Sequence, residues 1–342
     1  MSEPVVIVGS GLAGYSVAKQ FRLIDKTTPL TLLTSDDGAF YSKPMLSTAF
    51  TKQKTPEQLA MMSADKQADA LQADIVTGTE VSMIDVVNKT VRYQDTTVAY
   101  RDLVLALGGE AIVPRLDGDA VSHVMSINSL MDYRACYPAI KQAKKVVILG
   151  AGLVGVEMAN DMQALDIQVH CVDLNTTPLA SCLPSPLGDV MKTAFEQAGV
   201  SWHLGCSGVA VHHADSGYQV TLSDDTTLQA DVVIAAIGIR PHVTLAQQAG
   251  LNVDRAILVN ELGQTSAPHV YALGDCAAVM GQWRPHIMPI AHCAKAIAKN
   301  LAGDQAHIQY PVMPIIAKTP LCPMVAVLPQ DKQGEWRYEH DE

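Results

Sequence analysis

The sequence predicts an α/β protein, because one strand, glycine-turn and helix pattern occurs in it twice. Residues 146–157 read VVILGAGLVGVE, an apolar run that leads into glycines at the G-x-G-x-x-G spacing, and residues 5–18, VVIVGSGLAGYSVA, repeat it. A short apolar run suits a strand covered on both faces of a parallel sheet. The glycines permit a tight turn, approach of a pyrophosphate and close packing of helix on strand. We therefore predict two Rossmann-like dinucleotide-binding units.

The glycines of both turns are the first candidate binding residues. They place a helix N-terminus, with its free N–H groups, beside a phosphate. A single match is also compatible with an ordinary turn between a strand and a helix, so it is the repetition that favours two nucleotide sites. The candidate residues are Gly9, Gly11 and Gly14 in the first turn and Gly150, Gly152 and Gly155 in the second.

Length and composition restrict the remaining possibilities. A chain of 342 residues suggests two or three domains. The net charge of -11 disfavours nucleic acid or an anionic membrane as a partner. No apolar run has the length of a membrane span, and the first predicted strand starts too early to leave room for a signal peptide. We expect a soluble, cytoplasmic protein.

The seven cysteines favour a reducing compartment. Their number is odd and they contain no C-x-x-C pair. This pattern is typical of reduced thiols rather than of a disulfide framework or a structural zinc site, and no metal site is expected. Each cysteine taken singly is best interpreted as a small buried hydrophobic residue.

In the first unit, a second strand is expected over residues 30–34. An acidic residue about 20 positions past the glycines usually binds the ribose. Here that strand ends in Thr34 and Ser35, and the acids Asp36 and Asp37 come slightly later. We assign the ribose contact to Thr34 and Ser35. The two aspartates are equally compatible with solvated turn residues.

Further along the first unit, Lys43 precedes a proline and directly follows the region of the second strand. A solvated surface lysine is the plain alternative, but this position should bring Lys43 beneath the cofactor. Residues 55–73 are expected to be helical and residues 75–100 to form strands and a hairpin, with Val81 beside the adenine. An apolar strand over residues 103–107 completes the first α/β block.

The second unit predicts which nicotinamide cofactor is used. Its second strand, residues 168–172, ends in Asp173, where a carboxylate that holds the adenosine 2′-hydroxyl belongs. The next residues, Leu174, Asn175 and Thr176, provide no arginine for a 2′-phosphate. The sequence therefore favours NADH over NADPH.

A third distinctive stretch, HVYALGDCA at residues 269–277, ends a strand on a glycine and Asp275. This carboxylate suits a polyol, although capping of a helix explains it equally well. A helix over residues 289–301 follows, and its N-terminus would direct partial positive charge at an anionic group. After Tyr310 the chain becomes proline-rich.

Together these motifs resemble the two-dinucleotide flavoprotein reductases, in which an FAD domain is interrupted by an NAD(P)H domain. The stretches YSKPMLST, GAGLVGVEMANDM, AIGIRPHVTLA, YALGDCA and AKTPLCP are most similar to the rubredoxin reductases of alkane-oxidising bacteria. The resemblance implies an FAD-binding domain at residues 1–111 and 241–310, and an NAD-binding domain at residues 112–240. It also implies an α+β interface domain at residues 311–342. Family members usually continue further, so we expect this last domain to be incomplete.

Carried over residue by residue, the resemblance implies the following cofactor contacts. The FAD pyrophosphate falls on Ser10, Gly11, Leu12 and Ala13, the ribose on Thr34 and Ser35, the adenine on Val81, and the ribityl and phosphate groups on Asp275. Lys43, Glu157, Ile287 and Lys318 would surround the isoalloxazine, with Lys43, Glu157 and Lys318 as the catalytic set. Glu157 and Lys43 would form an ion pair beside flavin N5, for which a buried structural salt bridge is the alternative.

The implied activity is hydride transfer from NADH to FAD, followed by single-electron transfer to rubredoxin in support of alkane hydroxylation. Disulfide reductases and coenzyme A disulfide reductases need cysteines after the second strand, and residues 39–50 contain none. The remaining alternatives are a ferredoxin reductase, the flavin module of a nitrite reductase, and a flavin-binding redox sensor with little turnover.

Overall fold

The computed structural model describes residues 3–327, 337 and 339. The chain divides into two compact units. Unit 1 comprises residues 1–43, 57–110 and 239–311, and unit 2 comprises residues 44–56, 111–238 and 312–342. Each unit is therefore assembled from segments that are far apart in the sequence.

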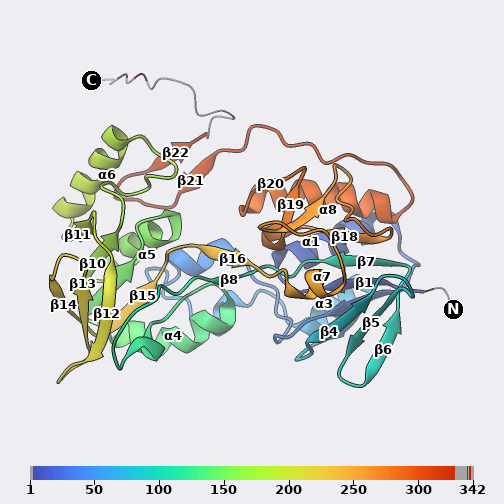
Figure 1. Cartoon of the computed structure of the whole chain (residues 1–342), viewed down its shortest axis with the longest axis horizontal. Coiled ribbons are helices and arrows are strands. Elements are labelled where there is room, and N and C mark those ends of the chain that lie inside the picture. Colours follow the sequence, from blue (N-terminus) through green and yellow to red (C-terminus); the bar gives the residue numbers. More distant parts are fainter. Residues whose placement is uncertain (1–2, 328–336, 338, 340–342) are drawn as a thin grey trace. The chain divides into compact units, whose positions relative to one another are not determined.

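Unit 1 contains a five-stranded parallel sheet with the strand order β18-β7-β1-β2-β3 (Figure 1). Its strands are β1 (Val5–Val8), β2 (Leu30–Leu33), β3 (Asp74–Val76), β7 (Asp102–Leu105) and β18 (Val270–Ala272). Strand β1 lies in the middle and pairs in parallel with β2 and with β7. All four residues of β1 are buried, which explains why an uninterrupted apolar run specifies it.

Five α-helices and several small sheets complete unit 1. Helix α1 (Leu12–Ile24) packs against α8 (Ile287–Leu301), so the helix after the first glycine turn touches the helix near residue 300 (Figure 1). The smaller elements are α2 (Pro56–Leu59), α3 (Ala64–Leu71), α7 (Thr244–Gln248), the meander β4 (Val81–Asp85), β5 (Thr90–Tyr93) and β6 (Thr96–Ala99), the sheet β17 (Ile257–Val259), β19 (Ala277–Val279) and β20 (Gln282–Trp283), and the pair β8 (Gly109–Ala111) and β16 (Ile239–Pro241).

The segment 55–73, which we predicted to be helical, contains two helices and is not helical throughout. A bridge between Phe40 and Met62 interrupts it, and the Ser63 side chain accepts a hydrogen bond from the N–H of Lys66 to start a new helix. A serine at an N-cap competes with continued helix because it satisfies an N–H that is otherwise unpaired. The strands expected over residues 75–100 are confirmed.

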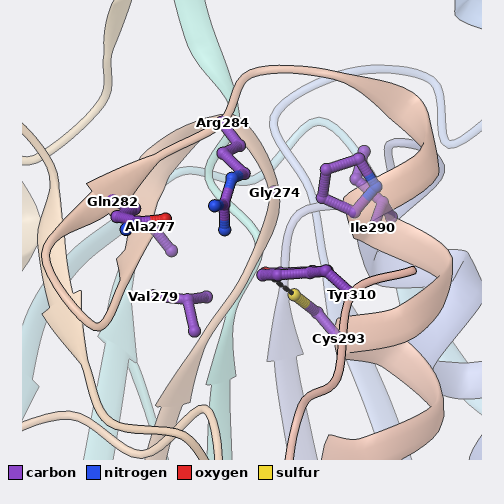
Figure 2. Close-up of a pocket in the computed structure, with 9 residues that line it drawn as sticks. Gly274, Ala277, Val279, Gln282, Arg284, Ile290, Cys293 and Tyr310 are labelled. Carbon is purple, nitrogen blue, oxygen red and sulfur yellow. Dashed lines mark hydrogen bonds between the residues drawn. The ribbon is translucent and has the colours of Figure 1, made fainter. Parts of the chain in front are cut away.

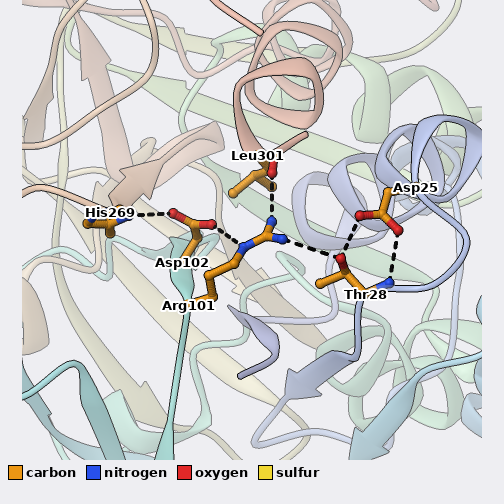
Figure 3. A network of polar contacts seen from close by, with 6 residues as sticks. All are labelled: Asp25, Thr28, Arg101, Asp102, His269 and Leu301. Atoms are coloured by element: carbon orange, nitrogen blue, oxygen red, sulfur yellow. Dashed lines mark hydrogen bonds and ion pairs between the residues drawn. The ribbon is translucent and has the colours of Figure 1, made fainter. Parts of the chain in front are cut away.

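A polar network at the N-terminal ends of the strands fixes the far end of α8 (Figure 3). Arg101 donates to the carbonyl of Leu301 at 2.6 Å and to Asp102 at 2.8 Å, and His269 Nδ1 lies 2.9 Å from Asp102. A guanidinium on the last carbonyls of a helix complements its dipole. The other end of α8 is thereby held at the carboxyl ends of the strands, where α/β proteins bind ligands.

Unit 2 contains a four-stranded parallel sheet with the order β11-β10-β9-β15. The strands are β9 (Lys145–Leu149), β10 (Gln168–Asp173), β11 (Ser201–Leu204) and β15 (Val232–Ala235). Also in unit 2 are the helices α4 (Leu130–Gln142), α5 (Leu153–Gln163) and α6 (Ser185–Gln197), the meander β12 (Gly208–His213), β13 (Tyr218–Leu222) and β14 (Thr227–Ala230), and the hairpin β21 (Ile315–Ala317) and β22 (Met324–Ala326). The predicted α/β fold with two Rossmann-like sheets is confirmed.

Within the described part of the chain, no helix combines the length and apolar character needed to cross a membrane.

Candidate functional site

The first glycine turn combines one open position with two crowded ones. A Cβ on Gly9 would lie 2.2 Å from the carbonyl oxygen of Ala106, and one on Gly14 would lie 1.9 Å from the carbonyl oxygen of Gly9. A Cβ on Gly11 would meet nothing within 4 Å. Gly11 is also the N-cap of α1, and no side chain caps the helix there. The free N–H groups therefore face open space, which fits a pyrophosphate.

Beside this turn, Asp36 accepts hydrogen bonds from three groups. Thr34 Oγ1 lies 2.7 Å from its carboxylate, Ser10 Oγ 3.0 Å, and the N–H of Gly38 2.9 Å. Thr34 and Ser10 are buried and Ser35 is exposed. The Asp36 carboxylate is therefore hydrogen-bonded within the protein, where it fixes the end of strand β2. It is not a solvated turn residue. The sequence did contain a signal for Asp36, because an acidic residue is expected about 20 positions past the glycines. We assigned the ribose contact to Thr34 and Ser35 instead.

Asp275 is brought next to the same turn by Gly274. A Cβ on Gly274 would lie 2.9 Å from the Cβ of Ala13, so residues 274–275 pack on the first turn of α1. Lys43 Nζ lies 3.2 Å from Asp275 Oδ2, and Trp283 donates its indole N–H to the Asp275 carbonyl. The turn, Lys43 and Asp275 therefore form one cluster within unit 1.

Two further predicted residues lie elsewhere in unit 1. Val81 begins β4, is 7% exposed and belongs to the core cluster, so a buried core role accounts for it as well as an adenine contact does. Ile287 is the first residue of α8 and is 41% exposed. No side chain caps α8, so its N-terminus could receive an anionic group, which stays a prediction for this helix.

The second glycine turn reproduces the geometry of the first. A Cβ on Gly155 would lie 2.0 Å from the carbonyl oxygen of Gly150, whereas one on Gly152 would meet nothing within 4 Å. Gly152 is the N-cap of α5 and has no side-chain cap. The two turns, one in each unit, therefore have the same open geometry, and each fits a phosphate.

Asp173 is built into this second turn. Its Oδ2 accepts a hydrogen bond from the N–H of Ala151 at 2.6 Å, and its Oδ1 accepts two from Asn175, each at 2.8 Å. The carboxylate therefore ties the end of β10 to the glycine turn. Asn175, which we noted only because it is not an arginine, holds the orientation of this carboxylate.

Glu157 lies in the middle of α5 and is 2% exposed. Its Oε2 lies 2.7 Å from Lys318 Nζ and accepts a hydrogen bond from Ser47 Oγ at 2.6 Å, and its Oε1 accepts the backbone N–H of Lys318 at 3.0 Å. The structure gives both residues of the predicted Glu157–Lys43 ion pair other partners, each within its own unit. Lys318 is the partner of Glu157, and Lys43 is the partner of Asp275. A short-range sequence pattern cannot choose between two lysines that are 275 positions apart.

The cysteines do not form a thiolate site. All seven are free. Burial raises the pKa of Cys276 to about 12 and that of Cys136 to about 11, so both thiols are protonated and unreactive near neutral pH. Cys293 points at Tyr310 in a cavity between β19 and the start of α8, with Sγ 3.1 Å from the phenol oxygen (Figure 2). That cavity has a volume of about 10 Å³, room for about one water molecule.

Among the described residues, no group of three or more histidine, cysteine, aspartate or glutamate side chains is arranged to hold a metal ion.

The sequence matches the family model of pyridine nucleotide-disulphide oxidoreductases over residues 3–298. The chain belongs to this family. A second model, the rubredoxin binding C-terminal domain, matches residues 307–342. As an FAD-dependent pyridine nucleotide oxidoreductase, the protein is an enzyme whose cofactors are FAD and NAD, as predicted, and the two open glycine turns fit their pyrophosphates.

Individual members of the family resemble the chain over nearly its whole length. It is 45% identical to the rubredoxin-NAD(+) reductase of Alcanivorax borkumensis, with 98% of this chain and 89% of that protein covered. It is 33% identical to the nitric oxide reductase FlRd-NAD(+) reductase of Vibrio vulnificus, covering 99% and 89%. A crystal structure of the covalent putidaredoxin reductase–putidaredoxin complex matches with a TM-score of 0.85 at 27% identity, covering 93% of this chain and 79% of that one.

Proposed function

We propose that this oxidoreductase oxidises NADH and delivers the electrons, one at a time, to a rubredoxin. The observation that carries the proposal is the match of residues 307–342 to the rubredoxin binding C-terminal domain. The similarity to the Alcanivorax reductase supports it. Bound FAD supplies the necessary chemistry, because a flavin accepts a hydride and releases single electrons.

The residues of the chain have separate tasks in this proposal. In the FAD domain, residues 1–111 and 241–310, the first glycine turn holds the pyrophosphate, and Thr34, Ser35 and Val81 hold the adenosine end. Asp275 binds the ribityl chain, and Lys43 sets its orientation through their 3.2 Å ion pair. In the NAD domain, residues 112–240, Gly152 and Asp173 hold the dinucleotide.

The groups proposed around the isoalloxazine are charged. Lys318 in unit 2 and the open N-terminus of α8 at Ile287 in unit 1 would each supply positive charge to a bound flavin, which favours its reduction. Glu157 holds Lys318 by an ion pair and by the backbone N–H, so it orients a cation and does not act as a base. Hydride transfer to a flavin needs no base. Alignment of the two rings and exclusion of water are the main contribution of the protein.

The reductase is further proposed to act in the cytoplasm and to support alkane hydroxylation. The similar Vibrio protein is named for a nitric oxide reductase, so a flavorubredoxin is the alternative electron acceptor. Comparison of kcat/KM for a free rubredoxin and for a flavorubredoxin distinguishes them. At least tenfold preference for the free rubredoxin is expected for the alkane pathway.

The choice of donor is tested at Asp173. The carboxylate should repel a 2′-phosphate, and a difference of about 1.4 kcal/mol corresponds to a factor of ten, so kcat/KM should favour NADH over NADPH at least about tenfold. Asp173→Asn keeps an oxygen that can accept the hydrogen bond from the N–H of Ala151, and it removes the negative charge. The variant should therefore show a smaller ratio of kcat/KM for NADH to kcat/KM for NADPH. Equal use of both nucleotides by the unchanged enzyme contradicts the assignment.

The electron exit is tested by removing every cysteine. Electrons should leave the flavin edge directly, so a cysteine-free variant that folds and binds flavin should still reduce rubredoxin. Because the chain carries a net charge of -11 and rubredoxins are acidic, local lysines must attract the partner, and the rate should fall strongly as salt is added. Loss of activity in a folded, flavin-loaded cysteine-free variant, or faster reduction of disulfides than of rubredoxin, refutes this route.

A further inference from the structure

The middle of α5 carries three polar side chains that are almost completely buried. Glu157, Asn160 and Asp161 are 2%, 7% and 2% exposed. Their spacing of three and four residues places them on one face of the helix. Buried polar groups persist in folded proteins because they are hydrogen-bonded. The partners of these three side chains therefore show what this face of α5 holds in place.

Two of the three side chains hold the turn between β21 and β22. Glu157 accepts the backbone N–H of Lys318, and Asn160 Oδ1 accepts the N–H of Leu321 at 3.1 Å. The turn is closed internally, because Thr319 Oγ1 donates to the carbonyl of Cys322 at 2.7 Å. The hairpin turn is thus attached to α5 at both of its sides.

The third side chain holds the segment that follows Lys43 in the sequence. Asp161 accepts hydrogen bonds from the backbone N–H groups of Phe50, at 2.8 Å, and Thr51, at 3.2 Å, and from the Thr51 hydroxyl. Ser47 of the same segment donates to Glu157. All of these contacts lie within unit 2.

One helix therefore joins two sites. Its N-terminus is the open glycine turn at Gly152, where NAD is proposed to bind. About two helical turns further along, its side chains hydrogen-bond to the β21–β22 hairpin, which lies within residues 307–342, the rubredoxin-binding match. We propose that Asn160 is a positioning residue for the electron acceptor: by holding Leu321 it fixes the β21–β22 turn in the arrangement that rubredoxin recognises. This inference rests on the proposed function.

Asn160 can be separated experimentally from the chemistry at the flavin. Lys318 is held independently, by Glu157 and by Ser47 Oγ at 2.8 Å, so it stays in place when the bond to Leu321 is lost. Asn160→Leu removes the acceptor at nearly constant volume. Ferricyanide is a small electron acceptor that needs no docking, so its reduction by NADH should not depend on the bond to Leu321. The rate should remain within about twofold of that of the unchanged enzyme, a smaller change than the loss of one hydrogen bond would cause.

The KM for rubredoxin should rise at least about fivefold in Asn160→Leu, the factor that corresponds to one buried hydrogen bond. Independently of turnover, hydrogen exchange of the backbone amides in residues 319–322 should become faster. Gln163→Leu is the matched control, because Gln163 on the same helix donates to Ala198 and not to the hairpin; its KM for rubredoxin should not change.

An unchanged KM in Asn160→Leu, or an equal fall in ferricyanide and rubredoxin activities, overturns the positioning role. Unchanged amide exchange also overturns it, because the bond then does not hold the turn. If the unchanged enzyme reduces ferricyanide with NADH but never reduces rubredoxin, the proposed function itself is refuted, and the acceptor role of Asn160 falls with it.

Discussion

A Gly11→Val variant is expected to fold and to purify without flavin colour. Gly11 has a φ of −66°, which valine adopts readily, and its Cβ would enter space that no atom of the chain occupies. The side chain would instead fill the place of the pyrophosphate above the N-terminus of α1. The flavin absorbance per chain and the thermal unfolding midpoint measure the two parts of this expectation.

Two other glycines serve as controls for Gly11→Val. Gly152→Val makes the same change in the second turn, and it should leave the flavin bound while NADH binding is lost. Gly14→Ala should fail to fold, because its Cβ would lie 1.9 Å from the Gly9 carbonyl oxygen. A folded Gly11→Val protein with its full complement of flavin shows that the first turn does not bind the pyrophosphate.

The second large effect is expected at Lys318. Lys318→Met leaves the Glu157 carboxylate, 2% exposed, with hydrogen bonds but no counter-charge. Breaking a buried pair from one side costs up to about 3–5 kcal/mol. Because the Lys318 side chain is itself 36% exposed, we expect about 2 kcal/mol of lost unfolding free energy. Denaturant unfolding of the flavin-loaded protein measures it.

A double-mutant cycle isolates this ion pair. Glu157→Gln removes the unpaired charge, so the double variant Glu157→Gln with Lys318→Met should lose clearly less than the sum of the single losses. Lys43→Met is the matched control, because Lys43 pairs with Asp275 and should show no coupling to Glu157→Gln. Coupling of Glu157 to Lys43 rather than to Lys318 contradicts the structure and favours the pairing expected from the sequence.

What could be predicted from the sequence was encoded locally. The two glycine turns were predictable because G-x-G-x-x-G states a backbone requirement within six residues, and the structure shows the steric reason at Gly9 and Gly14. The strand that precedes each turn was predictable from its apolar run. The place of Asp173 at the end of β10 was predictable in the same way, from its distance to the glycines, whereas its contact with the ribose stays a prediction.

What was missed depends on contacts between distant segments. Lys43 and Lys318 are both reasonable partners for Glu157, and only packing of the β21–β22 turn on α5 selects Lys318. Asn160 and Asp161 look like ordinary helix residues in the sequence, since their partners, Leu321 and the segment 50–51, are more than one hundred positions away. Asp36 was undervalued because its hydroxyl donors come from two separate segments.

An anaerobic titration followed by absorbance tests the central claim, NADH-to-rubredoxin electron transfer, most directly. One equivalent of NADH per bound flavin should bleach the flavin absorbance. Oxidised rubredoxin added next should be reduced while the flavin colour returns, and two rubredoxins should be consumed per NADH, because NADH gives two electrons and rubredoxin takes one. A flavin that NADH bleaches but that rubredoxin leaves bleached would contradict the account.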